Sequence, residues 1–78
     1  MRFEFTQHAR ERCRERGIRY RDVQTTVSNP TKTRVTASGT IEATGKIRNK
    51  TLIVIFETQK EIRVIITAYY EDQLRQTC

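Results

Sequence analysis

The chain has 78 residues, of which 36% are hydrophobic and 31% are charged, with three glycines and one proline. This length allows one small domain, and the composition is typical of a globular protein. Multidomain enzymes, Rossmann-type cofactor-binding proteins and repeat arrays are therefore excluded, and we expect residues 1–78 to form a single domain.

Fifteen Lys and Arg residues against nine Asp and Glu residues give a formal net charge of +6. A positive field of this size on a short chain favours polyanionic partners, either nucleic acid or an acidic protein. The alternative is a charged surface that serves only solubility. No apolar run approaches the ~20 residues that cross a bilayer, and the first ten residues, MRFEFTQHAR, contain no apolar signal core. We therefore expect a cytoplasmic protein without membrane contact.

The cysteines and the histidine do not form a metal-binding pattern. Cys13 and Cys78 are far apart, no CxxC or Cys/His grouping is present, and His8 is the only histidine. Asp and Glu residues do not cluster as a divalent-cation site requires. The sequence therefore predicts no metal site and no cofactor, and a Cys13 that is a small buried residue of a helix.

The first part of the chain predicts a strand followed by a helix. Residues 2–5 alternate polar and aromatic side chains, which is typical of a short strand, and Thr6 is a suitable N-cap. A helix over residues 7–16 follows, with Ala9 and Cys13 on a narrow apolar stripe. Gly17 ends this helix.

A second helix and a group of strands follow. The second helix covers residues 20–28 and ends at Asn29-Pro30. The hydrophobic period then changes to two, which predicts strands over residues 31–36, 40–48 (broken by Gly45), 52–56 and 62–70, with a turn at Asn49-Lys50. Residues 71–78 are polar and are expected to be a frayed tail. The predicted fold is α+β, with N-terminal helices on one face of a curved antiparallel sheet and the other face open.

Two groups of residues are candidates for chemistry. His8, Arg12 and either Glu15 or Arg16 lie at helical steps of three or four and so share a face, which predicts that His8 lies at the boundary between core and solvent. A histidine can move protons near neutral pH, although it can equally cap or bridge the helix and the sheet.

The second group lies on the strands. Lys46 and Arg48 alternate with Ile47 and are expected to project to the opposite face, while Thr67 and Tyr69 share one face and Tyr70 takes the other face or the strand end. Such a face could hold a phosphodiester and a stacked base, or it could simply be a solvated outer face. The full set of nucleic-acid-binding candidates is Arg10, Arg19, Arg34, Arg48, Lys50, Thr67 and Tyr70.

The chain resembles a prokaryotic family, domain of unknown function 4258. The resemblance rests on Phe5-Thr6-x-His8-Ala9-x-x-Arg12-Cys13-x-x-Arg16-Gly17-Ile18, on Asp22-Val23, on Asn29-Pro30 and on the ending Val64-Ile65-Ile66-Thr67-Ala68-Tyr69, and it covers roughly residues 3–70. The family often has Met where this chain has Cys13, and an acidic residue or Ser where it has Arg19-Tyr20.

The resemblance implies a fold similar to the RelE, ParE and BrnT toxins of toxin–antitoxin pairs. RelE-like and BrnT-like proteins cut RNA without metal, whereas ParE-like proteins inhibit DNA gyrase. It further implies a cognate acidic antitoxin as partner, and RNA or the ribosome as target. By position, His8, Arg12, Arg16, Lys46 and Tyr69 are the catalytic candidates, although Arg12 and Arg16 could instead anchor the helix to backbone carbonyls.

Three hypotheses about function follow. The first is a metal-independent endoribonuclease acting on mRNA, on translating ribosomes, in which His8 or Tyr69 takes the proton from the ribose 2′-hydroxyl and Arg12, Arg16 and Lys46 stabilise the phosphate. The second is a non-enzymatic basic module that binds gyrase, nucleic acid or an antitoxin. The third is an intact relative without activity. A homodimer through an exposed last strand is a further expectation.

Overall fold

The described part of the chain contains, in order, one strand, two helices and four strands. The computed structural model describes residues 2–71. Its elements are β1 (Arg2–Phe5), α1 (Gln7–Arg16), α2 (Tyr20–Ser28), β2 (Lys32–Val35), β3 (Ile41–Ile47), β4 (Lys50–Gln59) and β5 (Ile62–Tyr70). The α+β class and the two helices are as predicted. The expected frayed tail lies outside the described residues from position 72 onward.

The five strands form one open sheet in the order β1-β5-β4-β3-β2. Strands β2 to β5 are an antiparallel meander, but β1 pairs parallel to β5. The prediction of a purely antiparallel sheet was therefore wrong. No hairpin joins β1 to β5, so no turn imposes an antiparallel direction on this pair.

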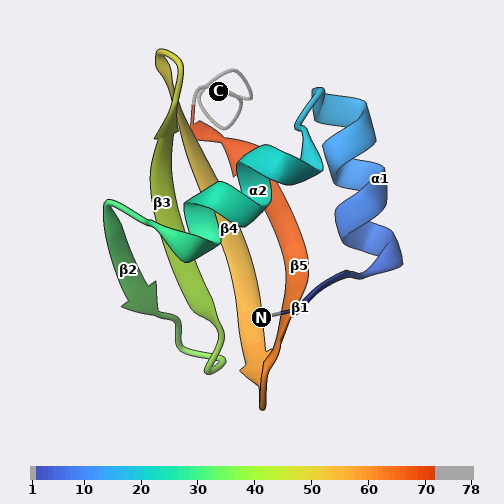
Figure 1. Cartoon of the computed structure of the whole chain (residues 1–78), viewed down its shortest axis with the longest axis vertical. Helices are drawn as coiled ribbons and strands as arrows, with labels where there is room; N and C mark the ends of the chain where they lie inside the picture. Colours follow the sequence, from blue (N-terminus) through green and yellow to red (C-terminus); the bar gives the residue numbers. More distant parts are fainter. Residues whose placement is uncertain (1, 72–78) are drawn as a thin grey trace.

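Both helices lie on the same face of the sheet. Helix α1 begins at Thr6, whose Oγ1 accepts a hydrogen bond from the N–H of Ala9 at 3.0 Å, and ends at Gly17 with φ of 67°. Figure 1 shows α2 crossing in front of β3 and β4 and α1 running beside β5. Ala9 and Cys13 of α1 and Val23 and Val27 of α2 join the core with the inward side chains of the strands.

One close contact joins α2 to the sheet. Gly45 lies inside β3 and is buried, and a Cβ atom at this position would be 2.9 Å from Oγ1 of Thr26. Gly45 interrupts the alternation of side chains, as expected, but the strand continues through it, and the missing side chain makes room for α2.

The turn between β3 and β4 is formed by Arg48 and Asn49, since Ile47 pairs with Lys50. The predicted turn at Asn49-Lys50 is therefore displaced by one residue. Arg48 has φ of 58°, which places it in the turn and outside the strand that carries Lys46. The expected shared face of Lys46 and Arg48 is not formed.

Strand β5 is internal, because β1 pairs with its first half and α1 runs beside its second half. The backbone N–H of Thr6 donates to the carbonyl of Ile65, and Nη1 of Arg16 donates to the carbonyl of Ala68 at 2.9 Å. The last strand is therefore not the exposed edge that the sequence predicted, and the edges of the sheet are β1 and β2. Within residues 2–71, no helix has the length and apolar character needed to cross a membrane.

Candidate functional site

The sheet face opposite the helices carries a mixed surface that we call the open face. Side chains alternate along β3 and β4, so that Ala43, Leu52 and Val54 enter the core while their neighbours point outward. The open face thereby receives Glu42, Thr44 and Lys46 from β3 and Thr51, Ile53 and Ile55 from β4.

A β-bulge decides which residues of β5 reach the open face. The register shifts by one residue between Ile55 and Phe56, since Thr67 pairs with Ile55 but Ile65 pairs with Phe56. Ile66 is the extra residue, and after it the alternation is reversed. Ile65 and Ala68 therefore both face the core, and Thr67 and Tyr69 both lie on the open face.

The strand register arranges these side chains in rows. Lys32, Thr44, Ile53 and Tyr69 lie opposite one another on β2, β3, β4 and β5, and we call this the Tyr69 row. Arg34, Glu42, Ile55 and Thr67 form the next row, which we call the Thr67 row. On the other side of the Tyr69 row, Lys46 lies opposite Thr51.

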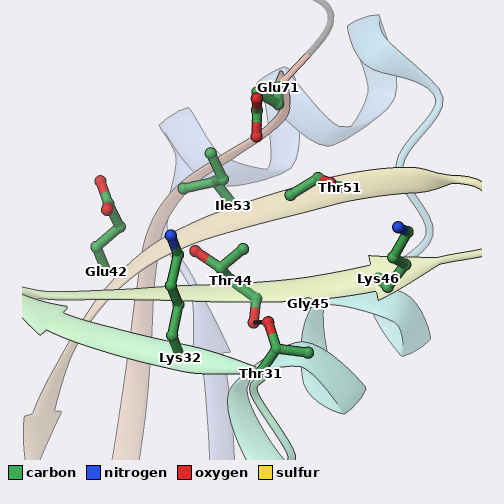
Figure 2. A pocket seen from close by; sticks show the side chains of 9 residues that line it. All are labelled: Thr31, Lys32, Glu42, Thr44, Gly45, Lys46, Thr51, Ile53 and Glu71. Carbon is green, nitrogen blue, oxygen red and sulfur yellow. Dashed lines mark hydrogen bonds between the residues drawn. The ribbon is translucent and has the colours of Figure 1, made fainter.

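A hollow of about 300 Å³ lies among these rows. Figure 2 shows Lys32, Thr44 and Ile53 rising from neighbouring strands on the same side of the sheet, with Lys46 farther along β3. The hollow is lined by Thr31, Lys32, Glu42, Thr44, Gly45, Lys46, Thr51, Ile53 and Glu71. Thr31 is fixed there because its Oγ1 donates to the carbonyl of Thr44 at 2.9 Å. The hollow therefore combines two ammonium groups, two carboxylates and several hydroxyls.

Tyr69 lies within electrostatic reach of four charged groups. Burial raises the pKa of its hydroxyl above the ordinary 10.0, and Glu42 and Glu71 act in the same direction, whereas Arg34 and Arg16 lower it. The hydroxyl therefore stays protonated at neutral pH and can donate a proton or a hydrogen bond.

Both arginines that lower the pKa of Tyr69 have partners within the chain. Arg34 pairs with Glu42 at 3.3 Å, although its side chain remains 72% exposed. Arg16 donates to the carbonyl of Ala68, so it anchors α1 to β5, which is the alternative role that the sequence left open for it.

The remaining residues of the α1 motif lie apart from this cluster. His8 is exposed in the first turn of α1, and the predicted position at the boundary of core and solvent was wrong, because the core face of the helix passes through Ala9 and Cys13. His8 is eight residues before Arg16, which is about 12 Å along the helix axis. Arg12 donates to Glu15 at 2.7 Å on the helix surface.

The nucleic-acid candidates divide between the two faces. Arg34 and Thr67 lie on the open face, and Arg10 lies with Arg14 and Tyr20 around a shallow hollow on the helix side. Arg19 is the N-cap residue of α2 and Arg48 is in the β3–β4 turn. Tyr70 points into the core, as its alternation with Tyr69 predicted, and Nζ of Lys50 lies 5.2 Å from the centre of its ring.

Several residues of the open face were not singled out from the sequence. Lys32, Glu42, Thr44 and Thr51 belong to it because of the register of β2, β3 and β4. The sequence shows that Glu42 and Thr44 share one face of the strand, because they alternate with Ala43. The sequence does not show which residues of the neighbouring strands lie opposite them. Within residues 2–71, no group of three or more His, Cys, Asp and Glu side chains converges as a metal ion would require.

Comparison with known proteins gives one match. A family model described as Domain of unknown function (DUF4258) matches residues 5–70. No curated protein and no solved structure matches the chain. The matched segment runs from the end of β1 to the end of β5 and so includes both helices and the open-face residues of β2, β3, β4 and β5. The chain therefore belongs to the DUF4258 family.

Proposed function

We propose that this chain is a metal-independent endoribonuclease of the toxin type, with a RelE-like fold, and that RNA binds on the open face around Tyr69. The observation that carries the proposal is the position of Tyr69. This protonated hydroxyl lies within electrostatic reach of the guanidinium groups of Arg16 and Arg34 and of the carboxylates of Glu42 and Glu71. It also lies in the same row as Lys32, whose side chain lines the neighbouring hollow.

Such a set of groups suits transesterification at phosphorus. The ribose 2′-oxygen attacks the phosphorus atom, the bond to the 5′-oxygen breaks, and the products carry a 2′,3′-cyclic phosphate and a 5′-hydroxyl. The carboxylate of Glu42 takes the proton of the 2′-hydroxyl, and Tyr69 donates its proton to the leaving 5′-oxygen. Lys32, Lys46 and Arg34 stabilise the charge of the pentacoordinate phosphate.

These roles differ in several respects from those assigned on the sequence. Tyr69 becomes the proton donor, because its raised pKa makes it a poor base at neutral pH. His8 has no role in the chemistry, because it lies at the far end of α1 from Arg16. Arg12 likewise keeps a surface position beside Glu15.

The test is cleavage of a reporter mRNA in a cell-free translation reaction, read by primer extension and by assay for the cyclic phosphate end. The variants Tyr69→Phe and Glu42→Gln are each expected to reduce the rate by about 10²-fold or more. The matched control is His8→Ala, which removes a titratable group from an exposed position and is expected to leave the rate within about threefold. Cleavage that disappears in His8→Ala and survives in Tyr69→Phe would contradict the assignment.

A second candidate function is a non-enzymatic basic module that binds RNA or gyrase. The observation that favours it is that Arg16, Arg12 and Arg34 already have partners within the chain, as in a stable binding surface. In that case the wild-type protein binds RNA with strong salt dependence, produces no cyclic phosphate, and retains its affinity in Tyr69→Phe. Inhibition of gyrase supercoiling by the wild-type protein would identify the ParE-like form of this function.

A further inference from the structure

Strand β2 is the exposed edge of the sheet. All four of its residues are exposed, and it has a neighbour, β3, on one side only. Figure 1 shows β2 at the border of the sheet, on the side away from α1. The opposite border differs, because β5 is protected there by β1, Thr6 and Arg16. An edge strand of this kind is a template for a further strand.

The hydrogen-bond pattern identifies which backbone groups point outward. The N–H of Thr36 donates to the carbonyl of Thr40 at 2.8 Å, next to the Val35–Ile41 pair. In an antiparallel ladder, hydrogen-bonded and non-hydrogen-bonded pairs alternate. Arg34 and Lys32 therefore turn their N–H and C=O groups toward β3, and Thr33 and Val35 turn theirs outward, where an added strand would pair with them.

The side chains of β2 select the charge of such a strand. Lys32 and Arg34 are both on the open face, with a hollow of about 340 Å³ beside them that Glu42 and Thr44 also line. Val35 lies on the helix side and is 71% exposed. A strand paired with β2 would therefore place alternate side chains on the open face, next to Lys32 and Arg34. The side chains between them would lie on the helix side, next to Thr33 and Val35.

A second copy of this chain does not satisfy these conditions. A two-fold axis that continues the sheet places residues of the same face opposite each other. The two registers that pair most of β2 oppose like charges: Thr33 opposite Thr33 of the second copy sets Lys32 against Arg34, and Thr33 opposite Val35 sets Arg34 against Arg34. Opposed like charges destabilise a strand pair. The other edge, β1, presents Glu4 beside Arg2 on the open face and so offers no net attraction for an acidic segment.

We propose that β2 is the docking strand for an extended acidic segment of a partner protein, which adds to the sheet as a sixth strand. Its carboxylates, at alternate positions, lie over Lys32 and Arg34, and its apolar side chains lie over Val35. This partner surface does not depend on whether the open face cleaves RNA.

The test uses an acetylated and amidated peptide of alternating Glu and Val, titrated into the ¹⁵N-labelled protein. We expect amide shifts that centre on Lys32–Val35 and slower hydrogen exchange at the amides of Thr33 and Val35. Lys32→Glu/Arg34→Glu is expected to weaken binding about tenfold or more. The control Arg10→Glu/Arg14→Glu has the same formal charge, +6 less 4, and lies on the exposed side of α1, so it should retain most of the affinity.

A second variant separates strand pairing from simple charge attraction. Thr33→Pro removes an outward N–H and leaves both cations in place, and proline is tolerated on edge strands. It should abolish the exchange protection at β2 while the circular dichroism spectrum stays that of the wild type. Equal binding of a Lys-Val peptide, shifts centred on β1 or α1, self-association through β2, or absence of binding at millimolar peptide would each overturn the proposal. None of these results bears on RNA cleavage, which is measured separately with Tyr69→Phe.

Discussion

Thr26 carries a buried hydroxyl whose oxygen has no hydrogen-bond partner among residues 2–71. Burial of an unsatisfied hydroxyl costs about 1–3 kcal/mol. Thr26→Val replaces the hydroxyl with a methyl group of similar size, so we expect the free energy of unfolding to rise by about 1 kcal/mol. Urea unfolding measures this change. A loss of stability would mean that the hydroxyl has a partner in solution, such as a bound water molecule.

The same contact makes Gly45 sensitive to substitution. Its Cβ would lie 2.9 Å from Oγ1 and 3.0 Å from Cγ2 of Thr26, so Gly45→Ala should destabilise the protein by about 1–3 kcal/mol. Both of these atoms are removed in Thr26→Ala, which serves as the matched background. We expect the penalty of Gly45→Ala to fall by about 1 kcal/mol or more there, measured as a double-mutant cycle. Equal penalties in the two backgrounds would show that the clash is relieved elsewhere.

Arg12 and Arg16 are both arginines of α1, but their surroundings differ. Arg16 donates to a strand carbonyl in a partly buried position, and Arg12 pairs with Glu15 at the surface. Arg16→Gln should therefore destabilise the protein by about 1–2 kcal/mol, whereas Arg12→Gln should change stability by less than about 0.5 kcal/mol. Thermal unfolding of both variants tests this, and a larger effect of Arg12→Gln would contradict the anchoring role of Arg16.

At the scale of elements, the β3–β4 and β4–β5 hairpins of the meander use basic residues where the backbone favours glycine. Arg48 and Lys60 begin the β3–β4 and β4–β5 turns with φ of 58° and 57°. For a residue with a Cβ atom, this backbone conformation costs about 1 kcal/mol or more. Glycine avoids this cost, but part of the gain is offset because glycine increases the conformational entropy of the unfolded chain. Lys60→Gly is thus expected to raise stability by up to about 1 kcal/mol, and Lys60→Val to lower it by a similar amount. The midpoint of urea unfolding should therefore be highest for Lys60→Gly, intermediate for the wild type and lowest for Lys60→Val. The reverse order would contradict the strained turn.

The elements themselves were largely predictable from the sequence because each has a local signal. Thr6 and Gly17 define the ends of α1 by capping and by a positive φ, and both act as predicted. The alternation in residues 62–70 gave the bounds of β5 correctly. Non-local pairing has no such signal. The parallel partner of β1 and the internal position of β5 depend on contacts between residues about sixty positions apart.

The candidate site was less predictable than the fold for the same reason. Tyr69 and Thr67 were placed on one face correctly, but strict alternation from Ile65 would have put both of them in the core. The bulge at Ile66 reverses that assignment, and it is located where Thr6 contacts β5. Lys32 and Glu42 join Tyr69 only through register. Conversely, His8 and Arg12 were grouped with the site by their spacing, yet spacing on one helix does not determine what the helix faces.

At the scale of the whole molecule, two of the groups of positive charge lie on separate surfaces. One is the open face, with Lys32, Lys46 and Arg34, and the other is the exposed side of α1, with Arg10 and Arg14. Because a net charge of +6 attracts RNA from any direction, affinity alone does not locate the binding surface. Variants of equal charge on the two surfaces are needed to distinguish them.

Lys32→Gln/Lys46→Gln and Arg10→Gln/Arg14→Gln both have a formal charge of +6 less 2. Each phosphate neutralised on single-stranded RNA contributes about 0.7 to the slope of log K against log salt, so loss of the one phosphate that both lysines hold lowers the slope by about 0.7. We expect this decrease for the lysine pair of the open face and a smaller one for the arginine pair, measured by fluorescence anisotropy with a labelled RNA. Equal decreases would mean that RNA responds to net charge alone, and a larger decrease for the arginine pair would place RNA on the helices. Either result would remove the open face as the RNA site, because a phosphate held between Lys32 and Lys46 requires both ammonium groups at the hollow.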